Sequence, residues 1–183
     1  MSKKDIFRDI VIKSTRKKRV NNYKKDKVLV EKLYRYITKN SFKSVMLYIP
    51  LKNEVNIIPL IKYLRAKGVQ IYVPFMVDKS FRLVKYRLPL QIKKFGIKEP
   101  KISYLKIREI DLAIVPIIGI DKNFKRVGFG KGMYDRFFEK NSKYIKHTIF
   151  IQRDLYVCTS IVTNSYDISA DGIFANSIKY IEI

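Results

Sequence analysis

The segment SVMLYIPLKNEVNIIPLIKYLRAKGVQIYVP, residues 44–74, decides the fold class of this 183-residue chain. Its two ends, residues 44–50 and 69–74, are continuous apolar runs closed by proline, a pattern typical of strands buried on both faces. Between them, residues 54–67 place apolar side chains at helical spacing and stop before Gly68, a residue favoured just past a helix end. A strand, a helix and a strand in succession predict a βαβ unit and therefore a parallel sheet.

The same alternation extends in both directions from this unit. Toward the N-terminus, Ser2 precedes a predicted helix with Ile6, Ile10 and Ser14 on one face. The other expected elements are helices over residues 28–37 and 133–139, strands over residues 81–88, 110–116, 148–151 and 172–175, and a basic loop over residues 89–109.

Together these elements predict an α/β fold in which helices flank a mostly parallel sheet. We find no repeat or linker, so we expect a single domain over residues 1–183. Ligands of such folds bind beyond the carboxyl ends of the strands, which directs attention to the loop after Val115.

The net charge of +23 is the strongest compositional signal. Such a charge is typical of proteins that bind nucleic acid or anionic membranes. However, it is unevenly distributed: residues 109–183 hold 10 basic and 9 acidic residues and are nearly neutral. No apolar run is long enough to span a bilayer, the start does not resemble a signal peptide, and the one cysteine excludes an internal disulfide. We expect a cytoplasmic protein, a monomer, with no membrane partner and nucleic acid as an unfavoured alternative.

The loop of residues 126–136, RVGFGKGMYDR, concentrates the chemistry. Three of the chain's seven glycines, Gly128, Gly130 and Gly132, alternate in it, so its backbone N–H groups can approach a ligand closely. A glycine-rich loop that opens a helix and carries Arg126 and Lys131 suits phosphate. The spacing matches neither a Walker A loop nor GxGxxG. A tight structural turn with incidental charge is the alternative interpretation.

This loop, with the preceding Val115-Pro116 and Ile120-Asp121, closely resembles the signature of the 5-formyltetrahydrofolate cyclo-ligase family. Further landmarks occur in the family's order along the chain: residues 4–8, residues 54–56, residues 95–100, and the aspartates Asp167 and Asp171. The resemblance implies a methenyltetrahydrofolate synthetase-like three-layer fold.

The resemblance also implies a reaction, the Mg²⁺- and ATP-dependent closure of 5-formyltetrahydrofolate to 5,10-methenyltetrahydrofolate with release of ADP and phosphate. It assigns Lys131 and Arg126 to catalysis and Asp135 and Asp171 to Mg²⁺. The residues that it assigns to ATP are Lys4, Arg8, Arg126, Gly128, Gly130, Lys131, Gly132, Met133 and Tyr134, and those that it assigns to the folate are Glu54, Ile49, Met133 and Tyr134.

Three residues depart from the family pattern. Met133 stands where a tyrosine is usual, Ile120 where a phenylalanine is usual, and Asn56 where an acidic residue is frequent. Met133 can still cover an aromatic ring but loses any hydroxyl contact.

Two other features have structural interpretations. His147, the only histidine, is expected to be structural or exposed, and Cys158 to be part of the core. A second functional hypothesis is a non-catalytic RNA-binding module of the same fold, because residues 1–44 hold 15 basic and 4 acidic residues with Tyr23, Tyr34 and Tyr36 interleaved.

Overall fold

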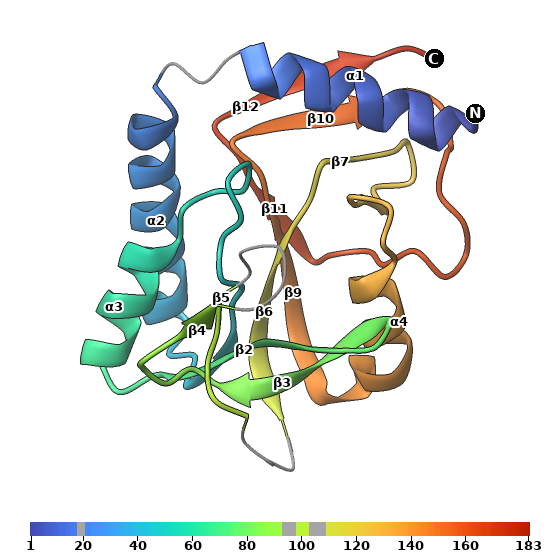
Figure 1. The fold of residues 1–183 in the computed structure, drawn as a ribbon. Helices are drawn as coiled ribbons and strands as arrows, with labels where there is room; N and C mark the ends of the chain where they lie inside the picture. Colours follow the sequence, from blue (N-terminus) through green and yellow to red (C-terminus); the bar gives the residue numbers. More distant parts are fainter. Residues whose placement is uncertain (18–20, 93–97, 103–108) are drawn as a thin grey trace.

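The computed structural model describes residues 1–17, 21–92, 98–102 and 109–183. Within these residues the chain forms two main sheets and four α-helices (Figure 1). The helices are α1 (Lys3–Lys17), α2 (Asn22–Lys39), α3 (Ile58–Ala66) and α4 (Met133–Asn141). None of the helices in the described part of the chain is long and apolar enough to cross a membrane.

The larger sheet has six strands in the order β11-β9-β6-β1-β2-β3. All neighbours run parallel except β3, which is antiparallel to β2, so the predicted α/β class with a mostly parallel sheet is confirmed. The strands are β1 (Ser44–Met46), β2 (Gln70–Val77), β3 (Ser80–Lys85), β6 (Ile110–Pro116), β9 (Ile145–Ile151) and β11 (Gly172–Phe174).

A second sheet, in the order β12-β10-β7-β8, was not predicted. Its strands are β7 (Gly119–Ile120), β8 (Arg126–Val127), β10 (Asp154–Cys158) and β12 (Ser177–Ile181), so the strand predicted as the last one, β11, is followed by another. The basic loop also contains a short antiparallel pair, β4 (Gln91–Ile92) and β5 (Lys98–Glu99). Part of the landmark at residues 95–100 lies outside the described residues.

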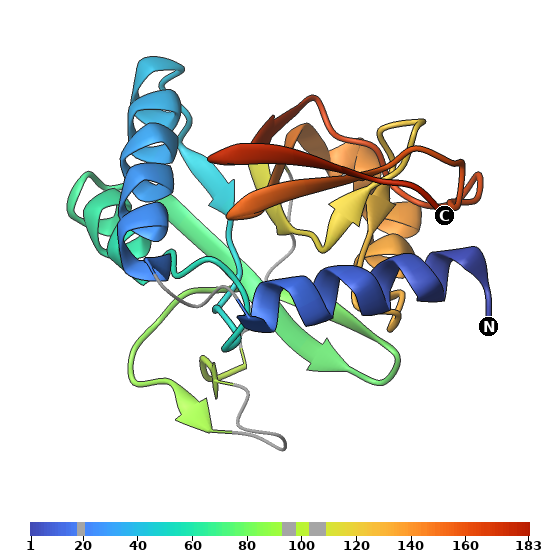
Figure 2. The same ribbon diagram turned by 90° about the horizontal axis from the view of Figure 1, so that it is seen from above.

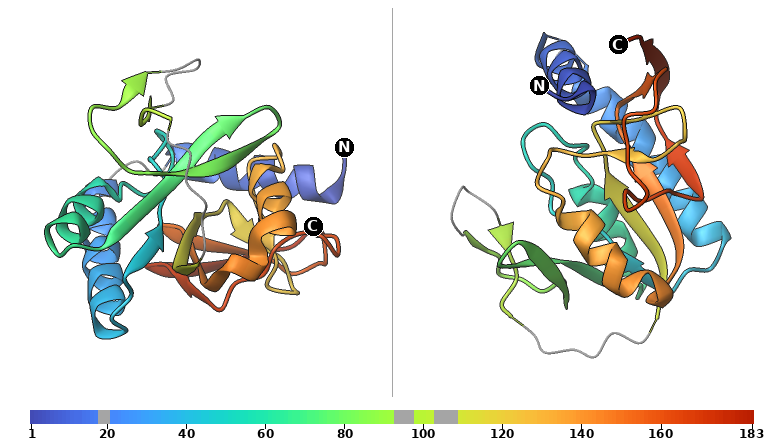
Figure 3. Two further views of the ribbon diagram at one scale, coloured as in Figure 1. Left: turned by 90° about the horizontal axis from the view of Figure 1, so that it is seen from below. Right: turned by 90° about the vertical axis from the view of Figure 1, so that its right-hand side faces the viewer.

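The helices divide over the two sheets. Helices α2 and α3 lie side by side on one face of the larger sheet, and α4 covers the other face (Figures 1 and 2). Each face has its own core: Val45 and Leu47 point into the α2–α3 side, whereas Met46 points into the α4 side. Helix α1 packs instead on the second sheet, beside the C-terminal strand β12 (Figures 2 and 3).

The predicted apolar face of α1 was wrong. Ile6 and Ile10 are 36% and 38% exposed, whereas Phe7 and Val11 are buried against the second sheet. The prediction failed because the buried face of α1 packs on the second sheet, which the sequence did not predict. The expected start of the helix is correct, since the Ser2 hydroxyl accepts the N–H of Asp5 at 3.2 Å.

Several boundaries also differ from the prediction. Strand β2 continues through Pro74 to Val77, because among the described strands β3 alone pairs with it beyond Tyr72, so no ladder hydrogen bond needs the missing proline N–H. Helix α3 begins at Ile58 with Pro59 in its first turn, so Glu54 lies in the preceding loop rather than in the helix. Strand β1 ends at Met46, although Leu47 and Tyr48 remain buried.

Two interpretations of single residues are confirmed. Cys158 is fully buried in the core beneath α1. His147 is exposed and its ring packs against Phe42 at a centroid distance of 5.6 Å.

Candidate functional site

A short hairpin after β6 leads into the glycine-rich loop. Strands β7 and β8 pair antiparallel, and the turn between them is fixed by Asp121, which is fully buried. Its carboxylate accepts the N–H groups of Asn123 and Thr163 at 3.0 and 2.9 Å. Burial works to raise the pKa of Asp121, but these hydrogen bonds outweigh it and the pKa lies below its ordinary value. Asp121 is therefore a charged anchor that ties this turn to the chain near residue 163.

Arg126, the first residue of the loop, is held as a buried cation. Its side chain donates from Nε and Nη2 to the carbonyl oxygen of Pro116 at 3.2 and 3.1 Å. Its Nη1 lies 3.8 Å from Oδ2 of Asp135, and its guanidinium lies over the ring of Tyr134, 4.8 Å from the centroid. Burial lowers the pKa of Arg126, and the charge of Asp135 works against that change. The guanidinium is thus fixed at the carboxyl end of β6 before any ligand arrives.

The structure explains why two positions of the loop are glycine. A Cβ atom at Gly128 would lie 2.3 Å from Nη1 of Arg126, so a side chain there would displace the guanidinium. Gly132, just before α4, has φ of 59°, a conformation that other residues adopt only at a cost. The loop geometry therefore depends on glycine at these positions.

The loop borders a cavity of about 220 Å³, called here the glycine-loop cavity. Helix α1 contributes two cations to it: Arg8 donates from Nε to the carbonyl oxygen of Gly128 at 2.8 Å, and Lys4 pairs with Asp167 at 2.6 Å. Four of the lining side chains are cationic and two are carboxylates. The lining residues are Lys4, Arg8, Arg126, Gly128, Gly130, Gly132, Asp135, Arg136, Tyr166 and Asp167.

Asp135 carries an unsatisfied oxygen in this cavity. Its Oδ1 is buried and has no hydrogen-bond partner within the described residues, while Oδ2 faces Arg126. A buried carboxylate oxygen without a partner is costly, and such an atom is a natural ligand for a cation. No group of three or more acidic, histidine or cysteine side chains that could hold a metal ion gathers in the described ranges.

Two residues predicted for this site lie elsewhere. Lys131 is exposed and is not among the residues that line the cavity. Asp171 is exposed, accepts the N–H of Thr148 at 2.7 Å and lines a different cavity of about 510 Å³. Asp167 lines both cavities, so the structure brings Asp167 rather than Asp171 to Asp135.

A second cavity, of about 630 Å³, contains the predicted folate residues Ile49 and Glu54 and is called here the Glu54 cavity. Oε2 of Glu54 accepts the N–H of Leu51 at 2.8 Å. Burial raises the pKa of Glu54, against the charges of Arg126 and Arg153. The remaining lining residues combine aromatic, aliphatic and cationic side chains: Pro50, Leu51, Lys52, Asn56, Ile58, Tyr86, Leu90, Lys98 and Arg153.

Glu54, Arg126 and Tyr134 influence one another electrostatically. Burial raises the pKa of Tyr134 well above its ordinary value, the charge of Glu54 adds to this, and Arg126 acts in the opposite sense. Glu54 in turn influences the pKa of Arg126, which lines the glycine-loop cavity. The predicted Met133 and Tyr134 line neither cavity, and both pack against the core on the α4 side. Tyr134 therefore lies behind the site, beneath the guanidinium of Arg126.

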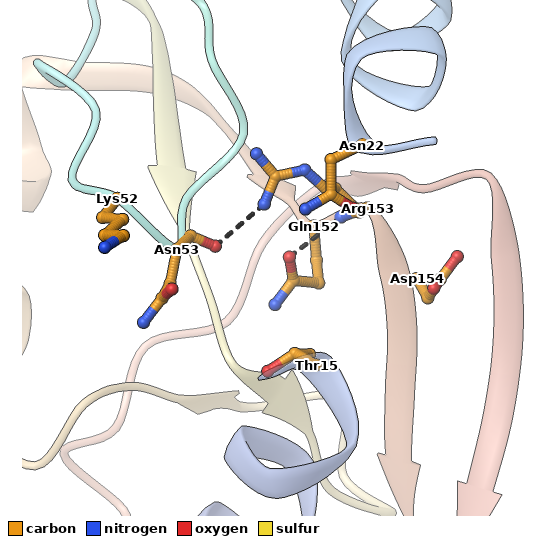
Figure 4. A pocket seen from close by; sticks show the side chains of 7 residues that line it. All are labelled: Thr15, Asn22, Lys52, Asn53, Gln152, Arg153 and Asp154. Carbon is orange, nitrogen blue, oxygen red and sulfur yellow. Dashed lines mark hydrogen bonds between the residues drawn. The ribbon is translucent and has the colours of Figure 1, made fainter. Parts of the chain in front are cut away.

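Some residues of the site were missed from the sequence. Arg136 and Tyr166 line the glycine-loop cavity; Arg136 belongs to the quoted motif, and only its position one turn after Gly132 could have suggested it. Arg153 lines the Glu54 cavity and also a third cavity of about 270 Å³, called here the Thr15 cavity (Figure 4). No motif surrounds Arg153, so no sequence signal identified it. The Thr15 cavity is lined by Thr15, Asn22, Lys52, Asn53, Gln152, Arg153 and Asp154.

Comparisons with known proteins identify the family of the chain. A sequence model of the 5-formyltetrahydrofolate cyclo-ligase family matches residues 2–176. A 5-formyltetrahydrofolate cyclo-ligase of Haemophilus influenzae is 31% identical over 108 residues, which cover 55% of this chain and 58% of the relative. One of Mycoplasma genitalium is 29% identical over 122 residues, covering 64% and 65%. These alignments thus span less than two thirds of the relatives' own length.

Solved structures share the fold. The 5,10-methenyltetrahydrofolate synthetase of Aquifex aeolicus superposes with a TM-score of 0.75 at 24% identity, covering 94% of this chain and 89% of that one. That of Mycoplasma pneumoniae gives 0.69 at 21% identity, covering 93% and 97%. The expected three-layer fold is therefore confirmed.

Proposed function

Since the chain belongs to the 5-formyltetrahydrofolate cyclo-ligase family, we propose that it closes 5-formyltetrahydrofolate to 5,10-methenyltetrahydrofolate and couples this to the conversion of ATP to ADP and phosphate. One observation carries the proposal. One cavity is lined by four cationic side chains, a larger one has aromatic and aliphatic walls, and Glu54 of the larger cavity acts on the charge of Arg126 in the first. A triphosphate suits the first environment and a pterin the second.

The reaction needs charge neutralisation and alignment more than a nucleophilic side chain. The formyl oxygen attacks the γ-phosphorus while the bond to the bridging oxygen breaks and ADP leaves. N10 then attacks the activated formyl carbon and loses its proton, and the C–O bond to phosphate breaks. Arg126 is suited to neutralise the transferring phosphoryl group because its position is fixed by Pro116 and needs no rearrangement.

The residues of α1 and of the loop hold the nucleotide in this proposal. Lys4 and Arg8 neutralise the phosphates from one side, and the backbone N–H groups of Gly128, Gly130 and Gly132 approach them from the other. Lys131, exposed at the loop, contributes long-range attraction. Because α1 and the loop both build one cavity, residues 1–183 act as one domain.

The chemistry of the cavity fits Mg²⁺. Asp135 would hold the ion through its unpartnered Oδ1, and phosphate oxygens of the nucleotide would complete the coordination, as is usual for this cation. Bound there, Mg²⁺ would offset the charge of the phosphates. Asp171, the second ligand that the resemblance assigns, remains a prediction that a variant can test.

The folate occupies the Glu54 cavity, with Ile49 as an apolar wall and Glu54 as the polar partner of the pterin. Glu54 Oε2 is engaged by Leu51, so Oε1 is the atom that turns to the substrate. The resemblance assigns Met133 and Tyr134 to both substrates. In this proposal they pack against the core and support the loop and Arg126 without lining either cavity.

The RNA-binding alternative loses part of its basis. Tyr34 packs edge-on against Tyr63, and Tyr36 against Phe42 and Phe174, so these rings are occupied by the core. Tyr23, at 80% exposed, stays available for stacking. We further propose a monomeric protein of the cytoplasm, where a lone buried cysteine stays reduced.

A direct assay tests the function. Purified protein with 5-formyltetrahydrofolate and Mg-ATP is expected to produce the near-ultraviolet absorbance of the methenyl product. Reactions without ATP or without Mg²⁺ are the controls. A well-folded protein that forms no product and binds no nucleotide in calorimetry would contradict the proposal.

A further inference from the structure

The loop of residues 51–56, which carries Glu54, borders two cavities. They are the Glu54 cavity of about 630 Å³ and the Thr15 cavity of about 270 Å³. Lys52 and Arg153 line both cavities. Leu51, Lys52 and Asn53 are exposed, so side-chain packing contributes little to the position of this part of the loop. Val55 anchors the end of the loop in the core, with its carbonyl oxygen accepting from the Tyr48 hydroxyl, so residues 51–54 depend on hydrogen bonds for their position.

Arg153 supplies these hydrogen bonds from the turn between β9 and β10. Its Nη1 donates to the carbonyl oxygen of Asn53 at 3.0 Å, the contact drawn between the two residues in Figure 4. Its Nη2 donates to the carbonyl oxygen of Glu54 at 2.5 Å. One guanidinium therefore holds two successive peptide groups of the loop, including that of Glu54 itself.

Asp26 of α2 orients this guanidinium. Its two carboxylate oxygens accept Nε and Nη2 of Arg153 at 2.6 and 2.8 Å, a bidentate arrangement. Asp26 Oδ2 also accepts the N–H of Asn56 at 3.0 Å. The ion pair thus holds the loop at three backbone groups, at residues 53, 54 and 56.

The pair is well shielded from water. The side chain of Asp26 is 10% exposed and that of Arg153 is 13% exposed, so solvent screens their attraction weakly. Lysine could keep the charge at position 153 but not the planar set of donors that reaches both the carboxylate and the two carbonyls. The geometry, and not the charge alone, holds the loop.

We propose that Asp26 and Arg153 are positioning residues that fix the loop of residues 51–56 so that the Glu54 carboxylate faces the folate. The inference rests on the proposed function and adds to it the ion pair that positions Glu54 for binding the folate. Glu54 Oε2 is tied to the N–H of Leu51 in the same loop, so the direction of the carboxylate follows the loop backbone. Neither Asp26 nor Arg153 lines the glycine-loop cavity, so we expect nucleotide binding to depend on the pair much less than folate binding does.

The test compares Arg153→Lys, Asp26→Asn and the double variant with the unaltered protein. For each single variant we expect KM for 5-formyltetrahydrofolate to rise about tenfold, because small misplacements of a positioning group weaken the productive geometry, while KM for ATP stays within about twofold. The double variant is expected to match the larger single effect, since the two residues act as one unit.

Lys25→Met is the matched control. Lys25 is the neighbour of Asp26 on α2 and pairs with Asp154 at 2.7 Å, but it forms no hydrogen bond to the described residues 51–56. It should leave both KM values within about twofold of the unaltered protein. Thermal unfolding of every variant separates loss of fold from loss of position. If Arg153→Lys does not fold, Asp26→Asn carries the test, because asparagine keeps the side-chain shape.

The outcomes are distinct. Absence of product with the unaltered protein overturns the proposed function. Product formation with an unchanged folate KM in folded variants overturns only the inference, as does an equal rise of both KM values or a rise in Lys25→Met as large as in Asp26→Asn.

Discussion

The two loops that build the site are held in different ways. The loop of residues 126–136 takes its shape mainly from its own residues, since Arg126 fills the space that Gly128 leaves empty and donates to Pro116, while Arg8 of α1 adds a hydrogen bond to Gly128. The loop of residues 51–56 is fixed from far away, by Asp26 and Arg153, which lie 127 positions apart in the chain. A loop held locally leaves a motif in the sequence, whereas a loop held by a distant ion pair leaves none.

The largest effect is expected for Gly128→Ala. The added Cβ would meet the Arg126 guanidinium at 2.3 Å, so Arg126 must leave its place on Pro116. We expect kcat/KM to fall about 100-fold or more, the scale of misplacing a group at the reacting centre. Steady-state kinetics measure the loss.

Gly68→Ala is the control for this variant. Gly68 has a positive φ of 74°, but a Cβ there would meet no heavy atom of the described residues within 4 Å, and the residue lies in the turn after α3. We expect about 1 kcal/mol lower stability and unchanged kinetics. If both alanine variants lose activity equally, local steric fit at Gly128 does not explain the loop.

Asp135→Asn comes next. The variant removes the charge of the unpartnered oxygen and leaves Arg126 without its opposing carboxylate. We expect a loss of about 10- to 100-fold in rate at low Mg²⁺, partly recovered at high Mg²⁺. A Mg²⁺ titration of the rate measures this. The same titration on Asp171→Asn decides between the two carboxylates, since an equal loss would assign both to the ion.

Lys131→Ala should have a smaller effect. The side chain is exposed, so its attraction for a polyanion is screened by salt. We expect KM for ATP to rise about threefold at low ionic strength and less at 0.15 M salt. Kinetics at two salt concentrations, with Lys140→Ala on α4 as control, provide the measurement. A loss of the size expected for Gly128→Ala would place Lys131 at the reacting phosphate instead.

The smallest effect concerns the pH dependence of stability. Burial raises the pKa of Glu54 above its ordinary value of 4.5, so the folded state keeps this proton after the unfolded state has lost it. The contribution of Glu54 to the free energy of unfolding is therefore full below pH 4.5 and is lost as the pH rises through the folded pKa. Denaturant unfolding of Glu54→Gln should lack this decline, and parallel curves for the two proteins would contradict it.

The sequence predicted the larger sheet but not the smaller one, for a physical reason. Strands β1, β6 and β9 are buried on both faces and appear as apolar runs. Strands β7 and β8 have two residues each, and β10 begins with the buried Asp154, whose charge is satisfied by Lys25 and Lys179. Such strands are defined by their partners rather than by their own pattern.

The same difference applies to the candidate site. The glycine loop and Glu54 could be predicted because their residues lie within recognisable motifs. Arg153 and Asp26 could not, since a single charge on a basic helix or turn is usually solvated and only the folded chain brings the two together. The sequence likewise could not predict that Lys131 lies outside the cavity, because a motif does not determine the direction of a flexible side chain.

The packing of α1 has a consequence for folding during synthesis on the ribosome. Phe7 is buried against Gly119 and Tyr156, and Lys4 pairs with Asp167. Helix α1 therefore cannot dock before the chain through residue 167 has emerged. Until then the two cations that α1 brings to the glycine-loop cavity stay in water, and we expect the growing polypeptide to bind no nucleotide before that point.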